Sequence, residues 1–129
     1  MPSQVPTSRP RVLIADDEPD MRVLLDELCR ARSLRATLVA DGGQAIAAIG
    51  DTAQPFDIVV TDVQMPEADG FQVLAAARAV SPSTRVVLIT GYGTDADRER
   101  ALRNGASEYL LKPVSIVTIG EVLDRLADL

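Results

Sequence analysis

The sequence contains no histidine and only one cysteine, Cys29. The absence of histidine excludes histidine nucleophiles, histidine general bases and histidine metal ligands. A single cysteine can form no internal disulfide and supplies no cysteine-based zinc site. Because Cys29 lies among apolar residues at helical spacing, we interpret it as a packing residue. Any chemistry must therefore use carboxylates, hydroxyl groups, lysine or arginine.

Long apolar runs and net positive charge are also missing. No segment approaches the roughly 18 apolar residues of a membrane span, and the Pro- and Ser-rich residues 1–10 lack the apolar core of a signal peptide. The net charge of -6 and the pI of about 4.5 disfavour direct binding to nucleic acid or to an anionic membrane. We expect a cytoplasmic protein with a flexible N-terminal tail at residues 1–10, whose partners are proteins or cations.

The length of 129 residues indicates one domain, at residues 11–129. Short apolar runs predict five strands, at Arg11–Ala15, Arg35–Ala40, Asp57–Thr61, Arg85–Ile89 and Ser107–Leu111. Apolar residues at helical spacing predict five helices, which begin near Pro19, Ala45, Gly70, Asp95 and Ser115. A turn at residues 41–43 precedes the second helix, and the fourth ends at about Asn104. Such alternation predicts an α/β fold, a parallel sheet with helices on both faces.

Polar side chains suited to catalysis or metal binding follow four of these strands. In chain order they are Asp16, Asp17, Asp62, Thr90 and Lys112. Ligands bind outside the carboxyl ends of the strands in an open parallel sheet, so these residues should meet at one edge. Three adjacent carboxylates repel one another, and Mg²⁺ relieves the repulsion because it takes oxygen ligands. With the lysine and the threonine this predicts a phosphate-binding site, in which a carboxylate is the best available nucleophile.

The motifs at these strand ends carry a family resemblance. They are Asp16-Asp17, Asp62 followed by Met65-Pro66 and Gly70, Thr90-Gly91, and Tyr109-Leu110-Leu111-Lys112-Pro113. In this combination and order the sequence resembles the receiver domain of two-component response regulators, from Val12 to about Leu129. The resemblance implies a flavodoxin-like fold, with a single doubly wound five-stranded parallel sheet of strand order 2-1-3-4-5 and five helices.

The resemblance also implies a role for each residue of the metal site. Asp62 is expected to accept a phosphoryl group from the phosphohistidine of a histidine kinase or of a His-containing phosphotransfer protein. Asp17 and Asp62 are expected to bind Mg²⁺ directly, together with the main-chain carbonyl of Gln64, and Asp16 is expected to act through water. Lys112 is expected to pair with the phosphoryl group, aimed into the site by a cis bond to Pro113.

A second set of residues is implied to report phosphorylation. Thr90 is expected to be the switch hydroxyl and Tyr109 the switch aromatic, while Gln64 and Tyr92 are expected to tune the lifetime of the phosphoryl group. The surface of the fourth helix, fifth strand and fifth helix would then change shape and bind a downstream partner or a second copy of the chain. Its candidate exposed residues are Arg98, Arg100, Arg103, Glu108, Asp124 and Arg125. A plain solvated charged surface is the alternative.

Other functions compete with this interpretation. The chain could be a receiver cut from a hybrid kinase or from a DNA-binding regulator. It could be an aspartyl-nucleophile phosphohydrolase, but those enzymes usually have a second aspartate where this chain has Gln64. A pseudo-receiver would usually lack the acceptor, the acidic pair or the lysine. The segment Gly91–Ala96 fits a loose dinucleotide-binding fingerprint, but it follows the fourth predicted strand instead of the first. We expect a signalling domain that catalyses only its own phosphotransfer and autodephosphorylation.

Overall fold

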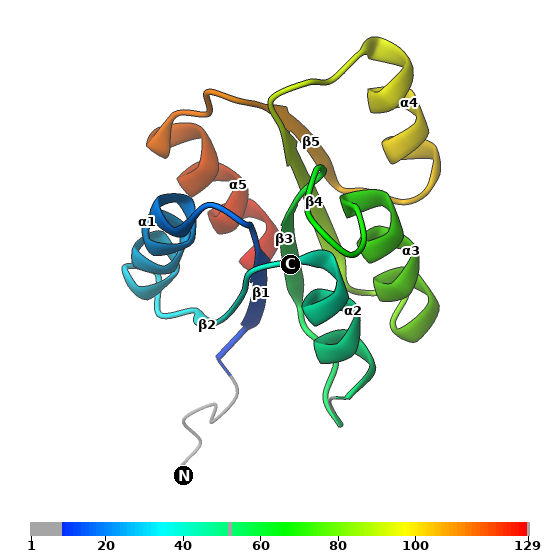
Figure 1. The fold of residues 1–129 in the computed structure, drawn as a ribbon. Coiled ribbons are helices and arrows are strands. Elements are labelled where there is room, and N and C mark those ends of the chain that lie inside the picture. Colours follow the sequence, from blue (N-terminus) through cyan, green and yellow to red (C-terminus); the bar gives the residue numbers. More distant parts are fainter. Residues whose placement is uncertain (1–8, 52, 129) are drawn as a thin grey trace, which may run out of the picture.

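The computed structural model describes residues 9–51 and 53–128 and places five parallel strands in one sheet (Figure 1). The strands are β1 (Arg11–Ala15), β2 (Arg35–Val39), β3 (Ile58–Asp62), β4 (Arg85–Thr90) and β5 (Glu108–Leu111). Their order is β2-β1-β3-β4-β5, which confirms the predicted topology. Residues 1–8 of the predicted tail lie outside the described residues. At its end, the Pro10 carbonyl accepts a hydrogen bond from the Arg35 amide at 2.9 Å.

Five helices cover the two faces of the sheet (Figure 1). They are α1 (Pro19–Arg30), α2 (Gly42–Gly50), α3 (Gly70–Val80), α4 (Asp95–Arg103) and α5 (Ile116–Ala127). Helices α1 and α5 lie on one face, and α2, α3 and α4 lie on the other. Within the described part of the chain, no helix is both long and apolar enough to cross a membrane.

The central strands are buried on both faces, which is typical of a doubly wound sheet. In β3 the side chains alternate: Ile58 and Val60 join the core under α1 and α5, and Val59 joins the core under α2 and α3. Cys29 is 1% exposed in the first of these cores, and burial raises the pKa of its thiol to about 11. Its burial among the apolar side chains of this core confirms that it is a packing residue.

Some predicted boundaries were wrong by one to three residues. Strand β3 begins at Ile58 and continues through Asp62, because Asp62 still pairs with Ile89 of β4. Helix α2 begins at Gly42 and not near Ala45. The predicted turn is in fact the helix start, since the Asp41 side chain accepts a hydrogen bond from the Gln44 amide at 2.7 Å. A side chain at Gly42 would meet the Ala68 carbonyl oxygen at 1.9 Å, so only glycine fits there.

Several further boundaries differ by one residue. Strand β2 ends at Val39, before the predicted Ala40, and β5 begins at Glu108, after the predicted Ser107. Helix α4 ends at Arg103, and Asn104 is its C-terminal cap. The predicted cap of the last helix is confirmed: the Ser115 hydroxyl accepts from the Thr118 amide at 3.0 Å.

Candidate functional site

Three carboxylates gather at the carboxyl ends of β1 and β3. These strands are neighbours in the sheet, with Ala15 paired to Thr61, so the residues that follow them are brought side by side. One ligand oxygen from each of Asp16, Asp17 and Asp62 lies within 4.8 Å of the others. Asp16 and Asp62 are buried, and Asp17 is exposed. A set of three carboxylate oxygens, one of them open to solvent, suits a hard divalent cation that keeps some of its water, such as Mg²⁺.

Asp16 is the most deeply buried of the three, at 1% exposed. The loss of solvation raises the pKa of its carboxyl group to about 6, although the Glu18 amide donates a hydrogen bond to its Oδ1 at 2.8 Å and Lys112 lies nearby. The charge of Asp62 adds to the rise. The neighbouring groups of the protein therefore do not fully offset the cost of burying the negative charge of Asp16. This is expected of a carboxylate that acts, together with Asp17 and Asp62, on one metal ion.

Lys112 follows β5 and extends its ammonium group over the acidic cluster. Its Nζ lies 3.3 Å from Asp62 Oδ2 and 3.8 Å from Asp16 Oδ2. Burial lowers the pKa of Lys112, but the hydrogen bond to Glu18 and the charges of Asp16 and Asp62 outweigh burial, and the net pKa is raised. The ammonium is therefore charged at neutral pH. The peptide bond between Lys112 and Pro113 is cis, as the family resemblance implies.

Glu18 is a site residue that the sequence interpretation missed. Its Oε1 lies 2.8 Å from Lys112 Nζ, closer than either aspartate, and this contact lowers the pKa of the Glu18 carboxyl group. A signal for it was present in the sequence. Glu18 is the residue before Pro19 at the start of α1, where Ser, Thr, Asp or Asn would be the preferred caps. Glutamate is a poor cap, so its side chain is available for another partner.

The two proposed switch residues lie on neighbouring strands, β4 and β5. Thr90 is fully buried, and its Oγ1 accepts a hydrogen bond from the Tyr92 amide at 3.1 Å. Tyr109 is 3% exposed, so its ring points into the protein, and burial raises the pKa of its hydroxyl. The hydroxyl lies against Gly93: a Cβ atom there would stand 2.4 Å from it. The loop after Thr90 thus makes room for the tyrosine.

The site opens to solvent as a shallow cleft. Its lining comes from four loops: Asp17, Glu18, Asp62, Gln64, Gly91, Tyr92 and Lys112. Gln64 is exposed, and its amide lies 3.4 Å from Asp62 Oδ1, which makes a weak hydrogen bond at best. Tyr92 is 80% exposed beside the cleft. Both residues are therefore placed where they would meet a molecule that approaches Asp62.

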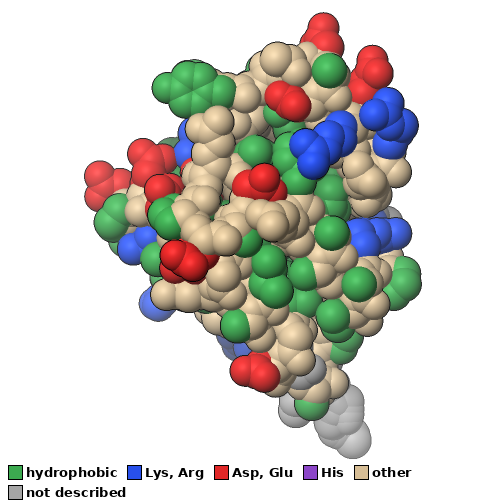
Figure 2. All heavy atoms as spheres, turned by 45° about the vertical axis from the view of Figure 1, so that its right-hand side comes forward, with side chains coloured by type: hydrophobic (Ala, Val, Ile, Leu, Met, Phe, Trp, Pro, Cys, Tyr) green, Lys and Arg blue, Asp and Glu red, His purple; other side chains and the backbone are tan. Residues whose placement is uncertain are grey.

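The surface predicted to change on phosphorylation is smaller than its six candidate residues imply. Arg98 donates to the Tyr109 carbonyl at 3.2 Å, and Arg125 forms an ion pair with the half-buried Glu108, so these residues join α4 and α5 to β5. Charged side chains gather over the upper end of the face where α4 lies (Figure 2).

Two of the six candidates turn away from this surface. The Arg100 guanidinium stacks 3.9 Å from the ring centroid of Phe71 on α3, and Asp124 pairs with Arg32, beyond the end of α1, at 2.9 Å. Both residues are exposed, as predicted, but these contacts direct their side chains toward α3 and α1.

Comparison with known proteins identifies the class. The chain belongs to the response regulator receiver domain family, whose model matches residues 12–124. Domains of this class are signalling phosphoacceptors and not conventional enzymes; they use Mg²⁺ and imply a cognate histidine kinase.

Two regulatory proteins of known sequence are similar to the chain. The chain is 34% identical over 124 residues to the transcriptional activator protein PfeR of Pseudomonas aeruginosa, covering 96% of this chain and 40% of the relative. It is 39% identical over 108 residues to the transcriptional regulatory protein TcrA of Mycobacterium tuberculosis, covering 82% of this chain and 41% of the relative. The chain therefore spans about two-fifths of the length of these two relatives.

Solved structures show the same fold. The chemotaxis response regulator CheY4 of Vibrio cholerae is 25% identical, with a TM-score of 0.81, covering 92% of this chain and 99% of that one. A CheY-like receiver domain protein of Methanospirillum hungatei has a TM-score of 0.86 at 24% identity, covering 94% and 95% of the two chains. This second likeness concerns the fold alone.

Proposed function

We propose that Asp62 is the residue of this receiver domain that accepts the phosphoryl group. The observation that carries the proposal is the position of its carboxylate, which lines the cleft beside two further carboxylates and lies 3.3 Å from the only lysine of the chain. One Asp62 oxygen bonds to phosphorus, and the P–N bond to the partner's histidine breaks. The electron pair of that bond stays on the imidazole nitrogen, which takes a proton from solvent.

The neighbours of Asp62 would bind the metal ion, contact the phosphoryl oxygens and control hydrolysis. Asp17, Asp62 and the Gln64 carbonyl would hold Mg²⁺ directly, with Asp16 acting through water, and the bound cation would supply positive charge for the phosphoryl oxygens. Lys112 donates to a phosphoryl oxygen from the opposite side, and the Thr90 hydroxyl donates to another. Gln64 and Tyr92 control the access of water to the new acyl phosphate, and so its lifetime.

Phosphorylation is reported through Thr90 and Tyr109. When Thr90 donates to the phosphoryl group, its hydrogen bond from the Tyr92 amide is strained or lost, and the loop that packs on Tyr109 moves. The surface formed by α4, β5 and α5 then binds a downstream protein or a second copy of the chain. Hydrogen bonds to charged groups contribute about 1.5–3 kcal/mol each, so two of them supply much of the roughly 5.5 kcal/mol that a nearly complete switch requires.

The relatives support a proposal for the setting of the domain. A histidine kinase or a His-containing phosphotransfer protein of the cytoplasm would be the phosphodonor. PfeR and TcrA are named as transcriptional regulators, and this chain matches only part of each. It would serve either as a stand-alone receiver or as the receiver of a larger regulator or hybrid kinase.

Intact-mass spectrometry after incubation with Mg²⁺ and acetyl phosphate tests the proposal. One phosphoryl adduct is expected, sensitive to hydroxylamine, dependent on Mg²⁺ and absent from Asp62→Asn. The absence of an adduct with acetyl phosphate, phosphoramidate and candidate kinases would leave a pseudo-receiver that acts only by binding. Turnover of many phosphate esters per protein would instead identify a phosphohydrolase.

A further inference from the structure

Lys112 has a closer partner than the proposed phosphoacceptor. Its ammonium nitrogen is 2.8 Å from Glu18 Oε1, against 3.3 Å from Asp62 Oδ2 and 3.8 Å from Asp16 Oδ2. The contact joins the start of α1 to the end of β5, 94 residues apart in the chain. The cation that should meet the phosphoryl group is therefore shared with a carboxylate outside the aspartate cluster.

The Glu18 side chain has no capping role that would explain this position. Glu18 occupies the residue before α1, but within the described residues its side chain caps no amide of that helix. The backbone of Glu18 is held separately, because its amide donates to Asp16 Oδ1. Its side chain is 63% exposed and lines the same cleft as Asp62. When another anion binds Lys112, the Glu18 carboxylate can therefore lose this contact and be hydrated instead, at little cost in free energy.

We propose that Glu18 is a positioning residue that shares the Lys112 ammonium with Asp62 in the unphosphorylated domain and must release it on phosphorylation. This inference rests on the proposed role of Asp62. The phosphoryl group adds negative charge beside Asp62, so Lys112 exchanges its contact with Glu18 for one with a phosphoryl oxygen. The exchange stabilises the unphosphorylated state relative to the phosphorylated one. It makes Glu18 a residue that slows phosphorylation and favours loss of the phosphoryl group.

A simpler effect must be separated from this one. Glu18 is an acidic group at the mouth of the cleft, and its charge alone would repel an anionic phosphodonor. Glu18→Asp separates the two effects, because it keeps the charge but shortens the side chain by one methylene group and breaks the contact with Lys112. Asp20→Asn is the control for net charge, since Asp20 is exposed on α1 and is not among the residues that line the cleft.

The first measurement is the rate of phosphorylation by acetyl phosphate at saturating Mg²⁺. Glu18→Gln and Glu18→Asp should both accelerate it by roughly two- to fivefold, the range expected for an exposed ion pair, and both should lengthen the lifetime of the adduct. Asp20→Asn should match the unmodified protein. If Glu18→Asp also matches the unmodified protein while Glu18→Gln is faster, the charge alone acts and the proposal is overturned.

The second measurement observes Lys112 directly. Because Lys112 is the only lysine, labelling with ¹³C-lysine gives NMR signals from this residue alone. Without phosphoryl analogue, the Cε signal should shift in Glu18→Gln and in Glu18→Asp but not in Asp20→Asn. With Mg²⁺ and beryllofluoride, a phosphoryl analogue, the signals of the unmodified protein and Glu18→Gln should coincide, because Lys112 has left Glu18. A difference that persists undiminished with beryllofluoride would show that the contact is never released.

The two proposals fail in different ways. If Asp62 is not the acceptor, acetyl phosphate forms no adduct at Asp62 on any of these proteins. If Asp62 is the acceptor but Glu18 has no role, adducts form at equal rates in all four proteins and the Lys112 signal is the same in each of them.

Discussion

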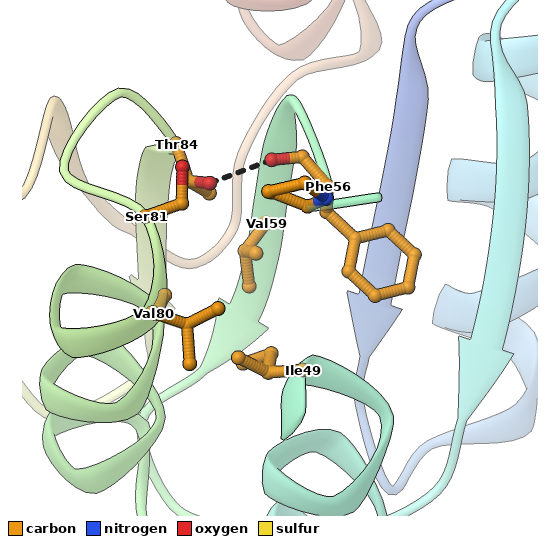
Figure 3. Close-up of a pocket in the computed structure, with 8 residues that line it drawn as sticks. Ile49, Phe56, Val59, Val80, Ser81 and Thr84 are labelled. Carbon is orange, nitrogen blue, oxygen red and sulfur yellow. Dashed lines mark hydrogen bonds between the residues drawn. The ribbon is translucent and has the colours of Figure 1, made fainter. Parts of the chain in front are cut away.

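Buried polar groups are paired to different extents at the two ends of the sheet. At the amino ends of β3 and β4, the Thr84 hydroxyl is buried and donates to the Phe56 carbonyl at 2.6 Å. Ile49, Val59 and Val80 point toward the small apolar cavity beside it (Figure 3). At the carboxyl ends, Asp16 and Asp62 are buried with charges that the protein compensates only in part.

The difference separates stability from function. Buried polar groups that are fully paired stabilise a fold, whereas buried carboxylates that share one ammonium cost stability unless a ligand completes them. Changes at the amino end should therefore alter the free energy of unfolding and leave phosphotransfer intact. Changes at the carboxyl end should alter phosphotransfer, and some should stabilise the protein.

Lys112→Met should produce the largest effect. It keeps the length of the side chain but removes the ammonium that faces Asp62. The rate of phosphorylation by acetyl phosphate should fall about 100-fold, as when one transition-state donor is removed. Arg35→Met, which removes an exposed cation from the edge strand β2, is the control and should have no effect on this rate. An equal fall in both variants would mean that net charge, and not the position of Lys112, governs the reaction.

Asp16→Asn should stabilise the metal-free protein in a pH-dependent way. The pKa of Asp16 is about 6 in the folded protein against 3.8 for an unperturbed aspartate, so the folded state binds the proton more tightly. The resulting stability is complete below pH 3.8 and is lost as the pH rises through 6. At pH 7.5 the loss is about 3 kcal/mol, and asparagine avoids it.

Urea denaturation in EDTA at pH 4 and pH 7.5 checks this prediction. The advantage of Asp16→Asn in the free energy of unfolding should appear at pH 7.5 and be small at pH 4. Saturating Mg²⁺ should reduce it, because the cation stabilises the unmodified protein. An advantage of equal size at both pH values would contradict the assigned cause.

Thr84→Val tests the amino end of the sheet. Valine has nearly the same shape, but the Phe56 carbonyl loses its donor in a buried position. The free energy of unfolding should fall by about 1–2 kcal/mol, measured by urea denaturation, and the phosphorylation rate should not change. Ser83→Ala removes a nearby hydroxyl of an exposed residue that contacts the Ser81 hydroxyl at 3.2 Å but not the Phe56 carbonyl, and it should lower the free energy of unfolding less than Thr84→Val does. A slower phosphotransfer in Thr84→Val would show that the two ends are coupled through β3 and β4.

Gly93→Ala should have the mildest effect, on the position of Tyr109. The new methyl group would meet the Tyr109 hydroxyl at 2.4 Å and Leu111 Cδ2 at 2.7 Å. Both are ends of movable side chains, so the ring should turn outward. Because burial raises the pKa of Tyr109, that pKa should then fall toward its ordinary value.

Absorbance titration of tyrosinate gives the readout for Gly93→Ala. In a Tyr92→Phe background, Tyr109 is the only tyrosine. Gly91→Ala is the matched control, since a Cβ atom at Gly91 has no described neighbour within 4 Å. The control should leave the Tyr109 titration unchanged, and a fall in both variants would indicate a general loosening of the loop.

The fold was predictable because its strongest signals are local. Apolar strands alternate with amphipathic helices, and the acidic, hydroxyl and lysine residues stand where each strand ends. The end of β3 was predicted one residue too early, because the pairing with β4 continues past the apolar run to Asp62 and Ile89. The start of α2 was missed because Gly42 and Gly43 favour turns, and the contact that requires glycine at position 42 comes from a distant loop.

The contacts between elements were not predictable. The pairing of Glu18 with Lys112 joins residues at opposite ends of the chain, and no periodicity points to it. Arg100 and Asp124 were placed on the switch surface because their elements form it. Which side of a polar helix faces which neighbour depends on packing, and α4 has so little apolar pattern that its sequence does not define its phase.

The most direct test of the account is to locate the phosphoryl group. After treatment with acetyl phosphate and Mg²⁺, borohydride reduction converts a phosphorylated aspartate to homoserine, and tryptic peptides are sequenced by mass spectrometry. Asp16 and Asp17 lie in the peptide that ends at Arg22, and Asp62 lies in the peptide that ends at Arg78. The account predicts homoserine at position 62 alone. Homoserine at position 16 or 17, or at several exposed aspartates, would contradict it.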